Sequence, residues 1–583
     1  MDDNKTVKQI TSNKGSWKRF GYVLSHARLP WIWIVVVLIV SLAATKLELL
    51  LPQYTSNLLN GDTSAHMIKL ALFSAGALFV VTFASNLVQG IGEVSITRNL
   101  RSVVWKRILG TKPSGFGDTQ PGEIISRVTT DTEVIGLFII KILYVMIPSI
   151  YFAVSVIITL YGINHTMLYW MLACIPFSVA ATVVWGRYNF SVQVKVYERI
   201  SNLTHYLSDR ITKMPLIKSY GTEEEEVAKG EEPIEGMYKA RVEAQKVMCA
   251  GNIAFNVIMG YIPNVILMLI GASLIGKGQL SFGDWVMFFM YTSRMTASIS
   301  VVIFEWADIK GTQGAIMRVS GIMMNPSEFD ETYPEKGAHE GDIELRDLQF
   351  SYGTEEIFEN LTMTIKEGKK TVLVGGSGSG KTTLLKLLER FYDVGDGQIL
   401  FNGKDINTYD IAATRKAISY ISQDAPMLGD TVREAVTYGV GRTVTDEEIV
   451  QALEAASAWD FVQKMPAGID SSIGDYGCRL SGGQRQKIAL TRGLLRNSRY
   501  VLLDESTSSM DACSALNVQK AIDNYIQGRT CIMISNNVSI VMEADEVIVL
   551  KDGGVEAVGD HESLLRDSAT YREFCSQGRE CQL

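Results

Sequence analysis

The chain has 583 residues, of which 55 are Lys or Arg and 63 are Asp or Glu, so its formal net charge is −8. Hydrophobic residues make up 47% and charged residues only 20%, and the mean hydropathy of +0.12 is higher than a wholly soluble protein of this size normally shows. This composition excludes a disordered chain, a collagen and a coiled coil, and the acidic balance argues against a dedicated nucleic-acid-binding protein. The seven cysteines form no C-x-x-C pair, so neither a zinc site nor a disulfide framework is indicated.

The first half of the chain contains six apolar stretches, each long enough to cross a bilayer as a helix, which takes roughly 20 residues. Lys and Arg are concentrated before the first stretch and in the connections after the second and fourth, whereas the alternate connections contain almost none. The positive-inside rule therefore places both termini in the cytoplasm. The predicted spans are residues 31–51, 70–91, 142–160, 167–185, 253–275 and 285–304.

Residues 1–29 begin with polar and charged side chains, so we expect a cytoplasmic segment and no cleavable signal peptide. Within it, Trp17, Phe20 and Leu24 recur at helical spacing and predict an amphipathic elbow helix on the inner leaflet. The two long cytoplasmic connections have helical rather than disordered sequences, which predicts that the spanning helices continue beyond the membrane. These features predict a transmembrane domain over residues 30–325, followed by a linker over 326–340.

From residue 341 to 583 the apolar runs are short, β-rich and separated by glycine, which predicts a soluble α/β domain. A predicted buried strand over 371–374 leads directly into Gly375-Gly376-Ser377-Gly378-Ser379-Gly380-Lys381-Thr382, and a helical pattern follows. This is G-x-x-x-x-G-K-[ST] in the strand–loop–helix context that a P-loop requires. The glycines let backbone N–H groups surround phosphates, Lys381 supplies a positive charge, and the Thr382 hydroxyl is placed to bind Mg²⁺.

A second predicted strand, over 500–503, ends in Asp504 and Glu505. Two acids at the end of an apolar strand indicate a site, and in P-loop proteins such groups hold Mg²⁺ and orient the attacking water. The segment Leu480-Ser481-Gly482-Gly483-Gln484 precedes another helical stretch and marks a second helix N-terminus that can bind an anion. One domain with two phosphate-binding helix ends suggests that two copies meet around the nucleotide.

With these motifs in this order, the chain resembles the ATP-binding cassette (ABC) half-transporters of the exporter type. The resemblance covers nearly the whole chain and implies a six-helix all-α transmembrane domain with long intracellular helical extensions. It also implies an α/β P-loop nucleotide-binding domain with a helical subdomain. A dimer of such chains would use ATP and Mg²⁺ to drive transport by alternating access in the plasma membrane of a bacterium, with the ATP domain in the cytoplasm.

The resemblance assigns roles to individual residues. Tyr352 matches the aromatic residue that stacks on adenine, and Asp511 lies in the D-loop that follows the catalytic Glu505. The implied metal ligands are Thr382, Gln423 and Asp504. The implied ATP-binding set is Tyr352, Gly375, Gly376, Ser377, Gly378, Ser379, Gly380, Lys381, Thr382, Thr383 and Gln423, and the signature that contacts the partner's ATP is Ser481, Gly482, Gly483 and Gln484.

The sequence departs from the family pattern at the position where a histidine normally contacts the γ-phosphate, because Asn536 stands there. Asparagine can donate a hydrogen bond but cannot carry charge, so we expect Glu505 and Asn536 to form a catalytic pair with reduced turnover. A second departure is Asp475-Tyr476-Gly477, where the family often has Glu-Arg-Gly. Many family members are heterodimers with one weakened site, but the intact signature and glutamate favour a homodimer slightly.

The transported solute is poorly encoded. The sixth span is rich in Met and aromatic residues and carries a charge, Arg294, about ten residues inside it. On an ideal helix Arg294 shares a face with Met287, Met290 and Tyr291, which predicts that this face lines a substrate cavity. Ordinary helix packing is an equal alternative for the Met-rich face, and for Arg294 the alternatives are pairing with an acid or capping a neighbouring helix.

Three functions remain open from the sequence. The first is ATP-driven export of an amphipathic, lipid-like or peptide-like solute, by a homodimer or by a slow-hydrolysing subunit of a heterodimer. The second is import of a metal–siderophore complex in the same fold. The third is a nucleotide-gated channel or sensor without useful turnover, which Glu505 disfavours and Asn536 favours.

Overall fold

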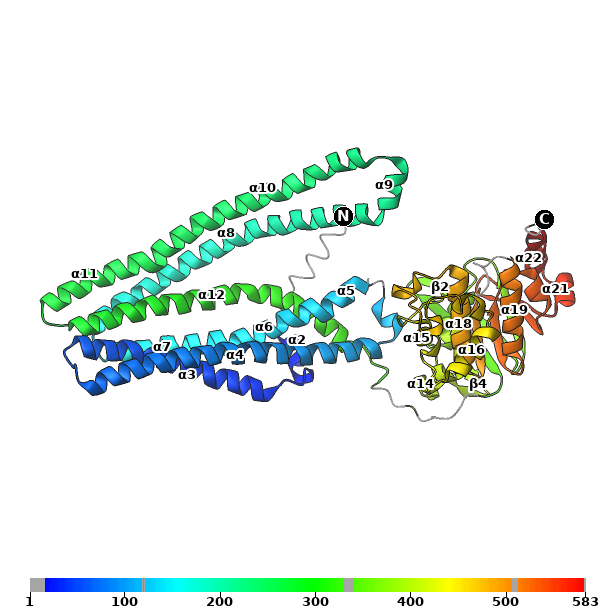
Figure 1. Cartoon of the computed structure of the whole chain (residues 1–583), viewed down its shortest axis with the longest axis horizontal. Coiled ribbons are helices and arrows are strands. Elements are labelled where there is room, and N and C mark those ends of the chain that lie inside the picture. Colours follow the sequence, from blue (N-terminus) through cyan, green and yellow to red (C-terminus); the bar gives the residue numbers. More distant parts are fainter. Residues whose placement is uncertain are drawn as a thin grey trace. The chain divides into compact units, whose positions relative to one another are not determined.

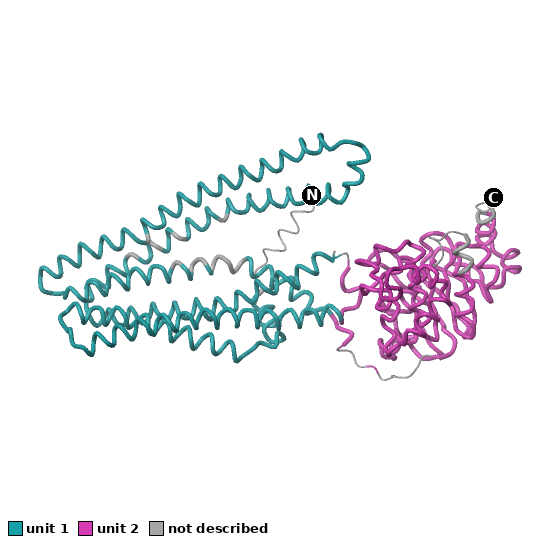
Figure 2. The backbone as a smooth tube through the Cα atoms, viewed as in Figure 1, with its two compact units in different colours: residues 1–109, 118–325 teal, residues 110–117, 326–583 magenta. Residues whose placement is uncertain are grey.

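The computed structural model describes residues 16–117, 119, 121–329, 333, 340–505 and 512–580. The chain divides into two compact units, which Figure 2 shows in different colours. The first unit contains residues 1–109 and 118–325, and the second contains residues 110–117 and 326–583. Most of the predicted linker over 326–340 lies outside the described residues.

The described part of the first unit is helical, and several of its helices are far longer than a bilayer requires (Figure 1). The basic residues from Arg98 to Arg107, for example, lie on the continuation of the second spanning helix rather than in a loop. This confirms the prediction that the spanning helices continue well beyond the length of the spans. The helices are α2 (Ser16–His26), α3 (Trp31–Leu59), α4 (Ala65–Gly110), α5 (Pro121–Ser126), α6 (Thr132–Lys141), α7 (Ile147–Tyr161), α8 (His165–Thr212), α9 (Met214–Tyr220), α10 (Glu223–Asn256), α11 (Ile262–Gly276) and α12 (Phe282–Met324).

Membrane-spanning character follows from length and composition. Among the described residues, four continuous helical stretches are long and apolar enough to cross a bilayer: Trp31–Leu59, Ala65–Gly110, Pro121–Tyr161 and His165–Thr212. They contain the first four predicted spans. The fifth predicted span falls on the end of α10, a π-helical turn at Val257–Tyr261 and the short apolar α11, and the sixth lies within α12. Many large apolar side chains of these helices are exposed, as lipid-facing residues are, for instance Ile32, Phe73 and Phe79.

The predicted amphipathic helix at the N-terminus is present as α2. Its apolar face packs inside the unit, because Phe20 makes an edge-to-face contact with Phe138 of α6 at a centroid distance of 5.8 Å and Val23 is fully buried. The Tyr22 hydroxyl donates to the carbonyl of Met323 at the end of α12, at 3.3 Å. A hydrogen bond therefore connects the first described helix of the unit to the end of α12.

The described part of the second unit contains two sheets. One is antiparallel, in the order β2-β1-β4-β5, and the other has the order β10-β9-β3-β8-β7-β6, in which β9, β3, β8, β7 and β6 run parallel. The strands are β1 (Ile343–Tyr352), β2 (Glu355–Ile365), β3 (Lys370–Gly375), β4 (Ile399–Phe401), β5 (Lys404–Asp405), β6 (Ile418–Ile421), β7 (Tyr500–Asp504), β8 (Thr530–Ile534), β9 (Glu546–Lys551) and β10 (Gly554–Gly559).

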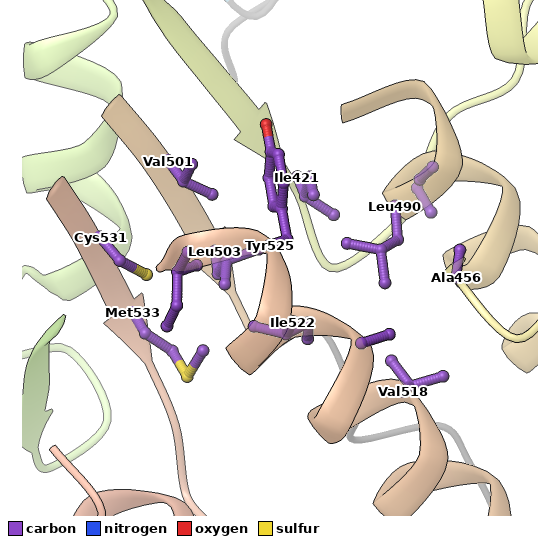
Figure 3. Packing of buried hydrophobic residues seen from close by; sticks show 14 of the residues in the cluster. Ile421, Ala456, Leu490, Val501, Leu503, Val518, Ile522, Tyr525, Cys531 and Met533 are labelled. Atoms are coloured by element: carbon purple, nitrogen blue, oxygen red, sulfur yellow. The ribbon is translucent and has the colours of Figure 1, made fainter. Parts of the chain in front are cut away.

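Ten α-helices lie among the described residues of the second unit, and they cover the parallel sheet or pack on the helices that do. They are α13 (Lys381–Leu388), α14 (Ile411–Ala417), α15 (Val432–Thr437), α16 (Asp446–Ala455), α17 (Trp459–Val462), α18 (Gly482–Arg496), α19 (Ala512–Ile526), α20 (Val538–Met542), α21 (His561–Asp567) and α22 (Ala569–Glu580). Figure 3 shows one core, in which Leu503 and Met533 from neighbouring strands meet Ile522 of α19. All five residues of β7 and of β8 are buried, as expected of strands covered on both faces.

A buried acid, Glu389, follows α13 and is 6% exposed. Burial raises its pKa to about 7, although Arg496 and Arg415 act in the opposite direction. Since the folded protein holds this proton more tightly than the unfolded chain, stability should fall as pH rises from about 5 to about 7, by up to about 3 kcal/mol. We expect Glu389→Gln to remove this pH dependence in thermal unfolding of the full chain.

The control for this prediction is the exposed Glu447 of α16, whose replacement by Gln should leave the pH dependence unchanged. Equal pH profiles for the wild type and Glu389→Gln would contradict the prediction.

Candidate active site

The candidate active site lies at one edge of the parallel sheet. Strands β6, β7, β8 and β3 are consecutive neighbours, so their carboxyl ends meet at the same edge. Gln423, Glu505 and Asn536 follow the ends of β6, β7 and β8 within two residues, and β3 ends at the first glycine of the P-loop. The sheet order therefore brings together residues that are up to 160 positions apart in the chain, counted from Gly376 to Asn536.

The P-loop has the backbone that the sequence predicted. Gly378 and Gly380 have φ values of +83° and +91°, a conformation that other residues rarely adopt. A side chain at Gly380 would also meet the ring of Phe358 at 2.5 Å. Helix α13 then starts at Lys381, so the loop delivers backbone N–H groups and a helix N-terminus to one place.

The Lys381 ammonium lies across this loop. It donates to the carbonyls of Gly375 and Gly376, each at 2.8 Å, and to the Ser379 hydroxyl at 3.4 Å. Burial lowers the pKa of Lys381, while the nearby carboxylates of Glu505 and Asp504 raise it. A bound phosphate would compensate this burial, which fits a group that meets the β- and γ-phosphates.

The predicted metal ligands are partly brought together. The Thr382 hydroxyl donates to Asp504 Oδ1 at 3.4 Å, and the Tyr420 hydroxyl donates to Asp504 Oδ2 at 3.4 Å. Burial raises the pKa of Asp504, the hydrogen bond from Thr382 lowers it, and the charge of Glu505 raises it. A divalent cation beside Asp504 would favour the ionised form.

These residues fit Mg²⁺. The cation prefers oxygen ligands and is usually held by one or two carboxylates together with substrate phosphates. A hydroxyl, a carboxylate and an amide oxygen, from Thr382, Asp504 and Gln423, are of that kind. No cluster of three or more His, Cys, Asp or Glu side chains suited to a metal is found in the described part of the chain.

Glu505 is held on both carboxylate oxygens. Asn536 donates its side-chain N–H to Oε1 at 2.6 Å, and Gln423 donates its side-chain N–H to Oε2 at 3.2 Å. The backbone is also constrained, because Glu505 has a φ of +43° and its N–H donates to the carbonyl of Ile534 at 3.1 Å. Asn536 thus contacts Glu505, the residue with which the sequence pairs it.

The predicted adenine-stacking residue, Tyr352, belongs to an aromatic cluster. Its ring lies edge-to-face with Phe350 and Tyr392, at centroid distances of 4.9 and 5.1 Å. Its hydroxyl donates to Thr383 of α13 at 3.4 Å. The hydrogen bond links the aromatic residue at the end of β1 to the helix of the P-loop.

The signature residues form a helix start. The backbone N–H of Gln484 donates to the Ser481 hydroxyl at 3.3 Å, and the N–H of Ser481 donates to the Gln484 side chain at 2.9 Å. This capping box fixes the first turn of α18, in which Gly482 and Gly483 lie. The D-loop aspartate, Asp511, lies outside the described residues.

A cavity of about 280 Å³ lies in the first unit, between α3, α4, α7 and α12 and the π-helical turn that precedes α7. Arg294 lines it and forms an ion pair with Glu48 of α3, with Nε donating to Oε1 at 2.5 Å. The sequence had left pairing with an acid as an alternative for Arg294, and this is the arrangement found. The lining residues are Ser41, Ala44, Thr45, Glu48, Leu78, Thr82, Ser85, Tyr144, Val145, Pro148, Ser149, Phe152, Arg294, Ser298 and Val301.

The other residues predicted for a substrate cavity lie elsewhere. Met287 and Tyr291 are buried in a hydrophobic cluster, where Tyr291 contacts Phe152 and donates its hydroxyl to the carbonyl of Leu49 at 2.5 Å. Met290 is half-buried and does not line this cavity. Met287 and Tyr291 hold α12 against its neighbours. For these two residues the structure therefore favours helix packing over a role in lining a substrate cavity.

Sequence reasoning missed Tyr420 and Glu48. An acid inside an apolar run that is long enough to span the membrane is itself a signal of a functional site, so Glu48 could have been found. Tyr420 is harder to recognise, because a strand aromatic beside a buried neighbour is usually ordinary core.

Two family models match the chain. The ABC transporter transmembrane region matches residues 31–299, and the ABC transporter model matches residues 358–508. The chain is 29% identical to an ATP-dependent lipid A-core flippase of Methylobacillus flagellatus over 568 residues, which covers 95% of each chain. It is 26% identical to a multidrug resistance ABC transporter ATP-binding and permease protein of Lactococcus lactis over 582 residues, covering 97% of this chain and 96% of the relative.

The fold has been seen before. A solved structure of a bacterial Atm1-family ABC exporter with ATP bound superimposes with a TM-score of 0.77, at 21% identity, over 94% of this chain and 97% of that one. The chain therefore belongs to the ABC transporters, as an exporter-type half-transporter that fuses a transmembrane region to an ATP-binding region. It is a multi-pass membrane protein and an ABC ATPase coupled to transport.

Proposed function

We propose that this chain is one half of a dimer that exports an amphipathic, lipid-like or peptide-like solute by alternating access. The observation that carries the proposal is that Glu505, hydrogen-bonded by Asn536 and Gln423, follows a strand beside a complete P-loop. The other unit of the same chain has helices long and apolar enough to span a membrane. Relatives over nearly the whole chain are a lipid A-core flippase and a multidrug transporter, which supports export of amphipathic molecules. The positive-inside pattern supports a bacterial plasma membrane with both termini and the ATP domain in the cytoplasm.

In the proposed hydrolytic step, the P-loop amides and Lys381 bind the β- and γ-phosphates of ATP. Thr382, Asp504 and Gln423 would hold Mg²⁺, which supplies charge neutralisation at the phosphate oxygens. Glu505 accepts a hydrogen bond from the attacking water and orients it. Both oxygens of Glu505 already accept amide N–H groups, so the water has to compete for one of their remaining lone pairs.

The second half of each ATP site would come from the partner. The first turn of helix α18, which carries the signature, is a site that can bind an anion. In the arrangement that the family implies, this turn contacts the ATP bound to the P-loop of the partner chain. Short helix α9, between α8 and α10, exposes Leu216 and Tyr220 and is the segment expected to reach the partner's ATP domain. The intact Ser481–Gln484 segment and Glu505 favour a homodimer over a heterodimer.

Export and import are separated by vesicle orientation. With ATP outside, inverted membrane vesicles that contain the chain should accumulate a fluorescent amphipathic dye, and right-side-out vesicles should not take it up. A siderophore importer would instead take up an iron–siderophore complex into right-side-out vesicles that are loaded with ATP. A gated channel would pass solute without steady ATP hydrolysis.

Asn536 is expected to limit turnover. An amide at this position offers a neutral contact where the family uses an imidazole, so the transition state should lose more stabilisation than bound ATP does. We expect Asn536→His to raise kcat by about tenfold or more with little change in KM, and Asn536→Ala to lower kcat. Single-turnover hydrolysis by the purified proteins measures this. The expectation is wrong if His gives no gain while Ala also leaves the rate unchanged.

A further inference from the structure

The cavity of the first unit contains an acid and a base that both face it. Glu48 and Arg294 line the cavity, and their side chains are 31% and 53% exposed, respectively. Charged groups within spanning helices are costly and usually mark a pathway or a binding site. The negative charge of Glu48 and the positive charge of Arg294 cancel, so the pair contributes no net charge to the cavity.

Hydroxyl groups make up much of the remaining polar lining. Four of the residues that carry these hydroxyls are only 3–8% exposed: Ser41, Thr45, Ser85 and Ser298. The Thr45 hydroxyl donates to the carbonyl of Ser41 at 2.9 Å, and the Tyr144 hydroxyl donates to Asn86 at 2.7 Å. A hydroxyl that donates in this way still has lone pairs that accept hydrogen bonds. The lining therefore offers acceptors beside Glu48, a combination that suits an ammonium group.

The size of the cavity limits the occupant. Ligand sites for small molecules are roughly 300–1,000 Å³, and this cavity is about 280 Å³. A short peptide or a lipid headgroup fits such a volume, whereas a whole lipid does not. Its apolar residues, including Leu78, Val145 and Phe152, provide contacts for a small hydrophobic portion.

From this cavity we infer that the polar part of the transported solute is a zwitterion, whose ammonium binds Glu48 and whose carboxylate or phosphate binds Arg294. The inference rests on the proposed transport function. A ligand with one charge would break the ion pair and leave one partner uncompensated within the spanning helices, where an unpaired charge is costly. A zwitterion replaces each partner by a new one and keeps the site neutral. Phosphatidylethanolamine headgroups and peptides with free termini share this chemistry.

The test measures binding to the full chain in nanodiscs without nucleotide. The probes are the tripeptide Ala-Leu-Ala with free ends, its N-acetylated form, which is an anion, and its methyl ester, which is a cation. We expect the zwitterion to bind the wild type about tenfold or more tighter than either derivative. If the natural zwitterion is a lipid headgroup, the tripeptide should bind more weakly in nanodiscs of phosphatidylethanolamine, because the lipid competes for the site. Nanodiscs of phosphatidylglycerol should not compete with the tripeptide.

Two variants give opposite expectations. Glu48→Gln leaves Arg294 unpaired and should make the N-acetyl peptide the best of the three probes. Arg294→Gln leaves Glu48 unpaired and should make the methyl ester the best. The control, Lys141→Gln, breaks an ion pair of 2.8 Å between α6 and Glu305 of α12, neither of which lines the cavity, and should bind like the wild type.

If the Glu48–Arg294 pair only holds α3 against α12 and binds no ligand, the expected results are different. Both variants would then weaken all three probes equally, and the zwitterion would have no advantage in the wild type. Either result overturns the inference, as does the absence of binding by the tripeptide together with no effect of the lipid headgroup. Zwitterion binding by a wild-type protein that fails to hydrolyse ATP would instead refute the proposed function, and only the assignment of a zwitterion-binding site would stand.

Discussion

Replacing Glu505 by Gln is expected to lower steady-state ATP hydrolysis by about 10²–10⁴-fold, the usual contribution of a positioned general base. The amide keeps the shape of the side chain but cannot accept the proton of the attacking water. Its contacts would also change, because Asn536 and Gln423 donate to both oxygens of the carboxylate, and an amide offers one oxygen only. ATP binding depends on the P-loop and should persist.

The measurement is phosphate release by the purified full chain, together with the amount of ATP retained after removal of free nucleotide. Glu505→Gln should retain ATP in a closed dimer, since the nucleotide binds but is not consumed. Phosphate release at the wild-type rate would show that hydrolysis does not use Glu505.

The second large effect is expected for Lys381→Ala. The Lys381 ammonium lies across the P-loop, where it donates to the carbonyls of Gly375 and Gly376. Its removal deletes the positive charge that meets the phosphates, and a truncated partner of a buried charge pair typically costs about 2–5 kcal/mol. The affinity for ATP should fall by about 10²-fold or more, and turnover should fall with it.

Lys386 of the same helix provides the matched control, because Lys386→Ala removes the same charge from α13 outside the loop. A fluorescent ATP analogue titrated into both variants gives the two dissociation constants. Equal affinities for Lys381→Ala and Lys386→Ala would contradict the assigned role of Lys381.

The ATP site was largely predictable from the sequence because its signals are local. Glycines at 375–380 and the acids at 504–505 follow apolar strands directly, and residues at strand ends share one sheet edge once the strands are parallel. The resemblance pairs Asn536 with Glu505, but the geometry of their direct contact was not predictable from a local pattern. It depends on the order of β7 and β8 in the sheet and on the positive φ of Glu505, neither of which has a local sequence pattern.

The membrane unit was less predictable for a similar reason. Apolar length reveals spans, but the pairing of Glu48 with Arg294 depends on how α3 and α12 are rotated against each other. An ideal helix puts Met287, Tyr291 and Arg294 on one face, yet the first two are buried in the core and only Arg294 reaches the cavity. The π-helical turns at 142–146 and 257–261 interrupt the regular periodicity further, and each is followed by a proline, Pro148 or Pro263, which cannot donate a helix hydrogen bond.

The central claim is that hydrolysis at Glu505 drives export by this chain. The most direct test reconstitutes the purified chain alone in proteoliposomes and records ATP hydrolysis and movement of an amphipathic dye in the same sample. The account predicts that wild-type protein hydrolyses ATP and accumulates dye from the side of the ATP domain, and that Glu505→Gln does neither. Dye movement that continues in Glu505→Gln, or that runs toward the ATP domain, would contradict it.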